Sequence, residues 1–385
     1  MKFLQIGDLH LGKKLYEISL YDDQVFMLKH IVRLLKEDDY DALFITGDIY
    51  EQAMPSQEAV RLFGNFLETL RAELPNLAVF IISGNHDSTI RLSYAREIFK
   101  TQNIFIQTSF DETYEPIIFE SGGERCAIFL LPFLQQSFFK NKKTSYGISS
   151  QGEILAEVSE FLQTKIIDEM PNVLLAHLYT TPVAQTEVQF RGTVEHVSAT
   201  LFHFFDYVAL GHIHSFSKIT DRMYYAGSPF AYSFDEVKNN NYKKFALRIE
   251  LNCREKKPQP FVSKVEIPQR HRLQVLNGEF SEFMSTDKFD AHRNDYLQIE
   301  LENSEAVESP MKLLHKKFPL IMHITQNNFQ SMMTNRTDNQ TIEAIGERDF
   351  KTIYTLFIKE IGSETDDAEL DLAQRFWNAA EEDNE

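Results

Sequence analysis

The first part of the chain alternates two patterns of hydrophobic and polar residues. Short apolar runs rich in Ile, Val, Phe and Leu are typical of strands buried on both faces. Longer segments carry apolar residues at spacings of three and four, which is typical of amphipathic helices. This alternation predicts an α/β domain with helices on both sides of a sheet. The predicted strands are residues 3–6, 42–46, 77–82, 173–176 and 207–210, and the predicted helices are residues 25–35, 60–70 and 155–162.

The pattern changes near a Pro-rich break at residues 256–260. One more strand is predicted at 261–267, and beyond Pro268 the elements become smaller. They indicate a compact α+β domain. Its predicted strands are residues 273–276, 296–301 and 320–324, and its predicted helices lie around 279–283 and 310–318.

The last part of the chain is polar and then acidic. Residues 327–341 are rich in Asn, Gln, Thr and Ser, which favours a linker. An amphipathic helix is predicted at 349–361, and Trp377 follows in an acidic stretch. We therefore divide the chain into a main domain (1–267), a small domain (268–326), a linker (327–348) and a helical acidic tail (349–385).

Composition limits the class of protein. Hydrophobic residues make up 43% of the chain and charged residues 25%, as in soluble globular proteins. No apolar stretch approaches the length of a membrane span, and the chain begins with a predicted strand rather than a cleavable signal. We expect a cytoplasmic protein with no membrane partner.

Cysteine spacing and net charge exclude further classes. Cys126 and Cys253 lie far apart without zinc-ligand spacing, which argues against a structural zinc site or a disulfide framework. We interpret Cys126 as a buried apolar residue. The net charge of −18 argues against coating of nucleic acid by bulk electrostatics. Part of that acidity lies in the tail, and an enzyme can still contact a polyanion through bound cations and a few local Lys and Arg residues.

Five polar strings lie where the five predicted strands end, and open α/β sheets bind ligands at the carboxyl ends of their strands. Taken singly, a string such as Asp-x-His occurs by chance, and a lone histidine after a strand is more commonly a core residue. All five in order are far more specific. They are Asp8-Leu9-His10, Gly47-Asp48, Gly84-Asn85-His86-Asp87, His177 and Gly211-His212-Ile213-His214.

Aspartate, asparagine and histidine are the ligands of a two-metal hydrolytic centre. Two adjacent cations need a carboxylate that bridges them, and Asp48 on its Gly-Asp turn is the candidate. Asp8 and His10 then serve one metal, and Asn85 and His177 serve the other. The two histidines of the last string are divided between the metals, in an order that the spacing leaves open.

His86 and Asp87 remain without an assigned metal. A histidine beside a metal ligand can donate a proton to a leaving oxygen or stabilise the charge of a pentacoordinate phosphate. A neighbouring carboxylate can fix the orientation of such a ring. We therefore interpret His86 as a catalytic group and Asp87 as its orienting partner.

This ordered set resembles that of the calcineurin-like metallophosphoesterases. Residues 1 to about 265 are similar to the nuclease domain of the SbcD subunits of bacterial exonucleases, relatives of archaeal and eukaryotic Mre11. Generic phosphoesterases share the metal strings but lack the last block of this resemblance. That block is Gly211-His212-Ile213-His214 followed by Tyr225-Ala226-Gly227-Ser228-Pro229 and Ser233-Phe234-Asp235-Glu236.

The resemblance implies a four-layer α-β-β-α sandwich with a small α+β capping domain at 268–326 and a helical C-terminal tail. It also implies that His86 is the catalytic histidine and that the centre holds two manganese ions. One ion would be bound by Asp8, His10, Asp48 and His214, and the other by Asp48, Asn85, His177 and His212.

The function implied is that of a manganese-dependent DNA nuclease, with exonuclease action on double-stranded ends and endonuclease action on hairpins or single strands. The implied partner is an SbcC-like ATPase, the counterpart of Rad50, in a heterotetramer built on a homodimer of this chain. The chain has no phosphate loop of its own. The helix at 349–361 is the candidate ATPase-binding element; alternatively, it packs on the capping domain.

The chain departs from the resemblance at one place. Many relatives carry a histidine shortly after the Gly-Asp string, whereas this chain has Ile49-Tyr50-Glu51-Gln52, so a role in strand choice does not transfer. Two other functions are weighed: a phosphoesterase for small nucleotides or phosphoproteins, and a scaffold that has lost catalysis. The complete ligand set argues against the scaffold. Candidate DNA contacts, or ordinary solvated charges, are Lys13, Lys14, Arg61, Arg91 and the basic residues of 140–143.

Overall fold

The computed structural model describes residues 1–111, 113–134, 150–181, 190–191, 194–237, 243–303 and 307–326. The chain divides into two compact units. The larger comprises Met1–Val275, Ala291–Gln298 and Phe318–His323. It contains two six-stranded sheets, and all seven residues predicted as metal ligands belong to it.

The first sheet has the strand order β16-β15-β1-β4-β5-β6. Its strands β1, β4, β5 and β6 are parallel, whereas β15 pairs antiparallel with β1 and with β16. The bounds are β1 (Lys2–Ile6), β4 (Ala42–Ile45), β5 (Ala78–Ile82), β6 (Ile104–Gln107), β15 (Lys244–Glu250) and β16 (Phe261–Ile267).

The second sheet has the strand order β13-β14-β12-β9-β8-β7. Its central strands β8, β9, β12 and β14 are parallel, and antiparallel strands close both edges. The bounds are β7 (Ile117–Ser121), β8 (Glu124–Leu131), β9 (Asn172–His177), β12 (Tyr207–Gly211), β13 (Ser217–Thr220) and β14 (Met223–Tyr225).

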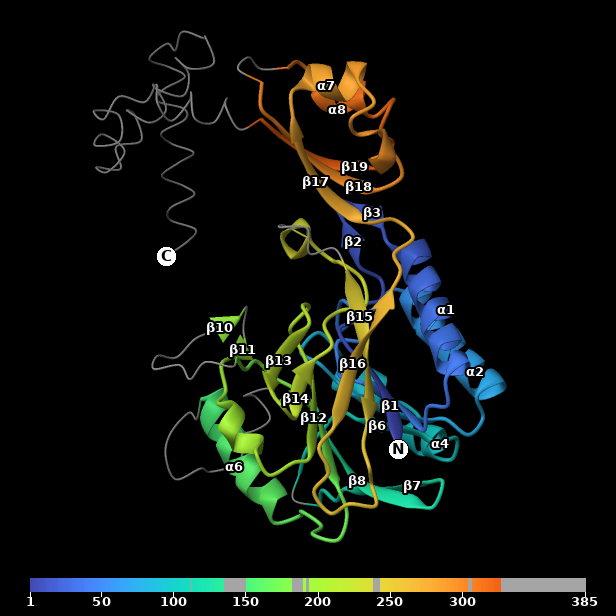
Figure 1. Cartoon of the computed structure of the whole chain (residues 1–385), viewed down its shortest axis with the longest axis vertical. Helices are drawn as coiled ribbons and strands as arrows, with labels where there is room; N and C mark the ends of the chain where they lie inside the picture. The colour runs from blue at the N-terminus through green and yellow to red at the C-terminus, as the bar shows by residue number, and fades with distance from the viewer. Residues whose placement is uncertain are drawn as a thin grey trace, which may run out of the picture. The chain divides into compact units, whose positions relative to one another are not determined.

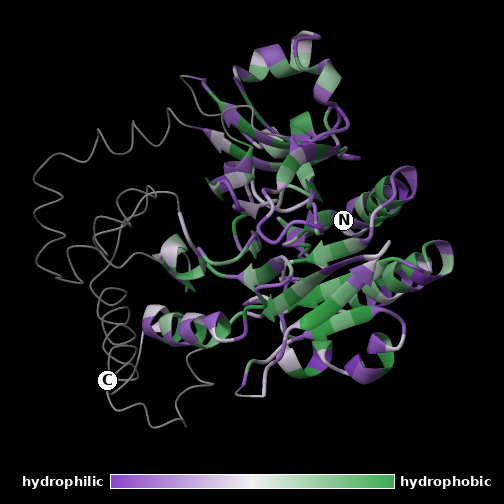
Figure 2. Ribbon diagram, turned by 60° about the horizontal axis from the view of Figure 1, so that its bottom comes forward, coloured by the Kyte–Doolittle hydropathy of each residue, from purple (hydrophilic) through white to green (hydrophobic). Residues whose placement is uncertain are grey.

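The two sheets face each other, and helices cover their outer faces. Helices α1 (Tyr21–Glu37) and α2 (Gln57–Glu73) pack on the first sheet, and α6 (Gln151–Gln163) packs on the second, on opposite sides of the strands in Figure 1. Apolar side chains of both sheets form a common core between them. Figure 2 shows that many residues of these strands are hydrophobic. This arrangement confirms the predicted four-layer α-β-β-α sandwich.

The predicted strands and helices of this unit are confirmed. The alternating pattern by itself predicted a single sheet with helices on both sides, and this prediction was wrong because the strands form two sheets. A strand such as β4 is buried on both faces whether its second face meets a helix or another sheet. The apolar run is the same in either case.

The remaining short elements are β2 (Lys14–Leu15), β3 (Ile18–Ser19), α3 (Thr89–Leu92), α4 (Arg96–Lys100), β10 (Phe190–Arg191), β11 (Val194–Glu195), η1 (Ala199–Phe202) and η2 (Phe234–Glu236).

Within the described residues, the smaller unit comprises Leu276–Asp290, Ile299–Lys317 and residues 324–326. Within it, the rings of Phe283 and Phe289 stack with centroids 4.1 Å apart. The elements of this part of the chain are β17 (Leu273–Gly278), α7 (Phe280–Ser285), η4 (Asp290–His292), β18 (Tyr296–Leu301), α8 (Pro310–Leu314) and β19 (Ile321–Gln326), and the three strands form one sheet.

The proposed domain boundaries stay a prediction. The linker, the tail helix and Trp377 lie outside the described residues, as does the basic segment 140–143. Cys126 and Cys253 are free, buried thiols in the core between the sheets. None of the described helices is long and apolar enough to cross a bilayer.

Candidate metal centre

All five polar strings meet at one edge of the sandwich. Asp8 and His10 follow β1, Asp48 follows β4 and Asn85 follows β5, so the first sheet supplies four of the predicted ligands. The second supplies the other three, because β9 ends in His177 and the last string begins at the end of β12. The backbone N–H of His212 donates to Asp8 Oδ1 at 2.9 Å, which joins the two sheets at this edge.

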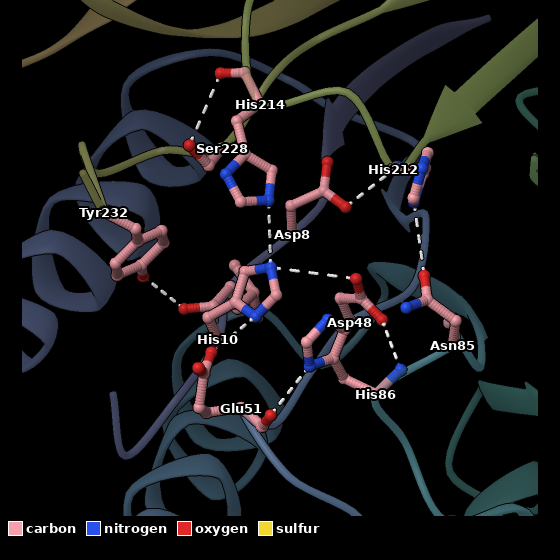
Figure 3. Close-up of polar contacts among 12 residues, drawn as sticks. Asp8, His10, Asp48, Glu51, Asn85, His86, His212, His214, Ser228 and Tyr232 are labelled. Carbon is pink, nitrogen blue, oxygen red and sulfur yellow. Dashed lines mark hydrogen bonds and ion pairs between the residues drawn. The ribbon is translucent and has the colours of Figure 1, made fainter. Parts of the chain in front are cut away.

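The ligand atoms form groups compact enough to hold metal ions. They are Asp8 with His10 and His214, Asp48 with His177 and His212, and His10 with Asp48 and His86. Asp48 Oδ2 lies 3.7 Å from His10 Nε2 and 3.5 Å from His177 Nε2, between the two sets of histidines. Figure 3 shows Asp48 between His10 on one side and Asn85 on the other.

The first set of histidines, His10 and His214, presents ring nitrogens that can bind a cation. His10 Nδ1 lies 2.9 Å from Glu51 Oε2, and His214 Nδ1 lies 2.9 Å from Glu236 Oε1. The hydrogen bond to Glu236 places a proton on His214 Nδ1, and the negative charge of Glu51 favours a proton on His10 Nδ1. Both contacts thereby leave the lone pair on Nε2. The two Nε2 atoms are 3.0 Å apart, so their lone pairs face each other. A divalent cation between them would turn this repulsion into two bonds.

The second set, His177 and His212, is arranged in a similar way. His177 Nδ1 donates to the carbonyl oxygen of Thr46 at 2.8 Å, which again leaves a lone pair on Nε2. That Nε2 lies 3.0 Å from Asn85 Oδ1, and His212 Nδ1 lies 3.2 Å from the same oxygen. Imidazole nitrogens and amide and carboxylate oxygens together suit a divalent transition metal. The residues therefore fit two ions on either side of Asp48, and the individual ligand roles stay a prediction.

The two carboxylates of the centre differ in their surroundings. Burial raises the pKa of Asp8, more than its neighbours His214 and His177 lower it. Burial also raises the pKa of Asp48, but His177, His10 and His86 outweigh it and hold that pKa below its usual value. The pKa of Asp48 is thus lowered and that of Asp8 is raised, although both carboxylates are buried.

The backbone at the strings lies in the left-handed region. The φ angles are 53° at Asp8, 43° at His10, 48° at Asp48 and 108° at His212. Such φ values are uncommon outside glycine, although Asp and His adopt them more readily than bulky residues. Strained backbone of this kind concentrates where a fold positions functional side chains.

Gly84 gives the tightest test of how the centre is packed. A Cβ atom there would lie 2.1 Å from Asp48 Oδ1 and 2.4 Å from Asp48 N. Gly84→Ala should therefore displace Asp48 and lower metal affinity, measured by calorimetric titration of manganese, by at least about 10-fold, as loss of a metal-positioning contact does. Gly64→Ala is the control: a Cβ in the middle of α2 meets nothing within 4 Å, so it should leave metal affinity unchanged and raise the unfolding free energy by up to ~1 kcal/mol. Parental metal affinity in Gly84→Ala would contradict the close packing.

His86 and Asp87 lie in the centre, but they do not act as a pair. His86 Nδ1 is hydrogen-bonded to the carbonyl oxygen of Glu51 at 2.8 Å. The buried carboxylate of Asp87 instead accepts the backbone N–H groups of Ile49, Tyr50 and Gly84 at 2.9–3.1 Å. The prediction that Asp87 orients the His86 ring was therefore wrong: Asp87 joins the backbones of two strings.

The buried position of Asp87 disfavours the ionised form of its carboxyl group. Burial, together with the nearby charge of Asp48, raises the pKa of Asp87 to about 6 against the lowering effect of the three N–H donors. We had linked Asp87 to His86 because the two residues are adjacent in sequence. In the structure, the Asp87 side chain points toward the loop backbone instead.

Four contacts around His214 were missed from sequence. Glu236 Oε2 pairs with the buried Lys244 Nζ at 2.6 Å, while Glu236 Oε1 holds His214. Lys244 Nζ also donates to the carbonyl of His214 at 3.0 Å and lies 3.1 Å from Ser228 Oγ. Ser228 and Glu236 stand in the block that carried the closer resemblance, and that block was the available signal. Burial raises the pKa of both carboxylates, but His214 and Lys244 lower the pKa of Glu236 to about 2, and His10 and Lys13 lower that of Glu51 to about 2.

Glu236→Gln should lower the affinity of one metal ion by up to about 10-fold, because a neutral amide oxygen accepts the proton of His214 Nδ1 less strongly than the carboxylate does. Calorimetric titration with manganese measures the two binding steps. The control is Asp235→Asn, which neutralises the adjacent but exposed carboxylate and should leave both steps unchanged. Equal affinities in Glu236→Gln and the parent would show that Glu236 only pairs with Lys244.

Comparison with known proteins agrees with this geometry. A family model described as calcineurin-like phosphoesterase matches residues 1–216, more than half of the chain. Among solved structures, a putative 5'-nucleotidase from Staphylococcus aureus in complex with alpha-ketoglutarate aligns with 83% of this chain and 58% of its own, at 10% identity and a TM-score of 0.38. The chain thus spans under two thirds of that structure, and the likeness is too weak to inform fold or function.

Proposed function

Since the chain belongs to the calcineurin-like phosphoesterases, and so to a family of metal-dependent hydrolases, we propose that it is a manganese-dependent DNA nuclease of the SbcD type. It would act as an exonuclease on double-stranded ends and as an endonuclease on hairpins or single strands, in DNA repair, recombination and replication. The observation that carries the proposal is the segment from Tyr225 to Glu236. That segment distinguishes the SbcD-like resemblance from generic phosphoesterases, and its Ser228 and Glu236 surround His214.

The proposed ligand sets follow the two groups of the centre. Asp8, His10, Asp48 and His214 would hold one ion, and Asp48, Asn85, His177 and His212 the other. When bound, the two ions would supply Lewis-acid stabilisation of charge on the phosphodiester. Asn85, His86 and His212 are only partly buried, which leaves this side of the centre accessible to a large substrate.

His86 is the proposed proton donor. Its Nδ1 is engaged by the carbonyl of Glu51, so Nε2 is the nitrogen that can face a substrate. Donation from Nε2 leaves the neutral ring with its proton on Nδ1, and the carbonyl oxygen continues to accept that proton in a hydrogen bond. Asp87 serves this chemistry indirectly, by holding the loop backbones.

The test is cleavage of hairpin and blunt-ended DNA by the purified chain with manganese, alone and with its ATPase partner. Nucleoside monophosphates and a phosphopeptide are assayed in parallel. We expect DNA cleavage and little release of phosphate from the small substrates. Turnover of nucleotides or phosphopeptides without DNA cleavage, in protein that contains both ions, would replace the nuclease proposal with the small-substrate phosphoesterase.

We further propose that the chain forms a homodimer that binds an SbcC-like ATPase through residues 349–361, which the sequence predicts to be helical and which lie outside the described residues. Phe350→Glu and Phe357→Glu should abolish co-purification with the ATPase and leave manganese-dependent turnover by the isolated chain unchanged. Retained co-purification would favour the alternative, in which this segment packs on the capping domain.

A further inference from the structure

We infer that Glu51 is a positioning residue that ties the ion-binding histidine His10 to the proposed proton donor His86. The inference rests on the proposed role of the centre in phosphoester hydrolysis. Glu51 stands in the loop after the Gly-Asp string, where this chain departs from the histidine-containing pattern of the proteins it resembles. Its own contacts carry the argument.

One residue holds both rings, through different atoms. The side-chain Oε2 of Glu51 lies 2.9 Å from His10 Nδ1, and the main-chain oxygen of Glu51 lies 2.8 Å from His86 Nδ1. The two rings meet edge to face, with centroids 4.9 Å apart. A displacement of Glu51 would therefore move the ligand and the proton donor together.

Two further contacts hold Glu51 in place. Its Oε1 pairs with Lys13 Nζ at 2.7 Å, and its backbone N–H donates to the carbonyl oxygen of Leu11 at 3.2 Å. The Glu51 side chain is 22% exposed and His10 is 2% exposed, so the carboxylate lies between solvent and a buried ring. The carboxylate thus reaches His10 from a fixed position.

The chemical effect is on the tautomer of His10. The Glu51 carboxylate, 2.9 Å from His10 Nδ1, favours the proton on that nitrogen through its charge, although the contact lacks hydrogen-bond geometry. The lone pair then stays on Nε2, which is the atom directed at His214 and Asp48. Without that carboxylate, the Nε2-protonated tautomer becomes accessible, and a nitrogen that carries a proton cannot bind a metal. The main-chain contact to His86 does not depend on the side chain at 51, so substitutions there separate the two roles.

The test compares Glu51→Ala and Glu51→Gln with the parent. Manganese titration by calorimetry should show one of the two binding steps weakened by about 10–100-fold in Glu51→Ala and by less in Glu51→Gln, whose amide oxygen keeps a partial negative charge beside Nδ1. NMR of histidine labelled with nitrogen-15, in metal-free protein, should show His10 protonated at Nδ1 in the parent and as a tautomer mixture in Glu51→Ala. Glu73→Ala, which removes an exposed carboxylate from α2, is the matched control and should change neither readout.

An unchanged His10 tautomer with both manganese affinities within about twofold of the parent would overturn the inference. So would equal weakening of the two binding steps, because that outcome indicates a general loss of structure. Neither readout uses DNA. A parent that fails to cleave DNA while Glu51→Ala still alters the His10 tautomer would refute the nuclease proposal and leave the role of Glu51 intact.

Discussion

Asp48→Asn should reduce phosphodiester hydrolysis by at least ~10³-fold and lower the bound metal from two ions per chain to one or none. Asn keeps the size of the side chain and tolerates the φ of 48° at this position, so the substitution removes mainly the negative charge. That charge lies between the two sets of histidines, within 3.7 Å of His10 Nε2 and 3.5 Å of His177 Nε2. A catalytic metal contributes several kcal/mol of transition-state stabilisation, and each ~1.4 kcal/mol is a tenfold change in rate.

Elemental analysis of the dialysed protein and the rate on hairpin DNA measure the two effects of Asp48→Asn. The matched control is Asp206→Asn. Asp206 is also a buried aspartate, but it precedes β12, whereas the centre follows the end of that strand. It accepts the backbone N–H of Asn172 at 2.9 Å, so its variant should lose stability while keeping two ions. Two ions and parental turnover in Asp48→Asn would rule out Asp48 as the bridge.

His86→Gln should lower kcat by roughly 10²–10⁴-fold while both ions stay bound, because general acid catalysis by one positioned side chain contributes about that much. The backbone N–H of His86 donates to Asp48 Oδ1 at 2.9 Å, and this contact survives the substitution. The loss should therefore appear in kcat at saturating DNA, with little change in KM.

His203→Gln is the control for His86→Gln, since His203 is exposed and its ring hydrogen-bonds locally to the carbonyl of Thr200. It should turn over at the parental rate. Parental kcat in His86→Gln would instead show that His86 does not donate the proton. Loss of one ion together with the rate would reassign His86 as a ligand, consistent with its place in a group with His10 and Asp48.

The sequence predicted the strands and the convergence of the strings because both depend on local pattern. Each ligand string lies at the end of a strand made mostly of apolar residues, and parallel strands bring their carboxyl ends to one edge. Residues as distant as Asp8 and His214 could therefore be grouped without knowledge of the fold. The division of His212 and His214 between the two metals came from the family resemblance and not from spacing.

The supporting contacts could not be predicted in the same way, because they depend on side-chain direction within turns. Asp87 follows His86 directly, yet it turns toward the N–H groups of Ile49 and Tyr50. Glu51 and Glu236 reach His10 and His214 from loops whose course no periodicity describes. A charged residue in a loop has too many available directions for sequence alone to select one.

Because the ligands are divided between the two sheets, the metal centre can form only at a certain stage of folding. Neither sheet alone carries a complete set, and the contact from His212 N–H to Asp8 Oδ1 closes a span of more than 200 residues. Such distant closure is entropically costly and tends to come late in folding. A nascent or partly folded chain would thus have no hydrolytic capacity, and ion uptake would mark the moment at which both halves of the sandwich have joined.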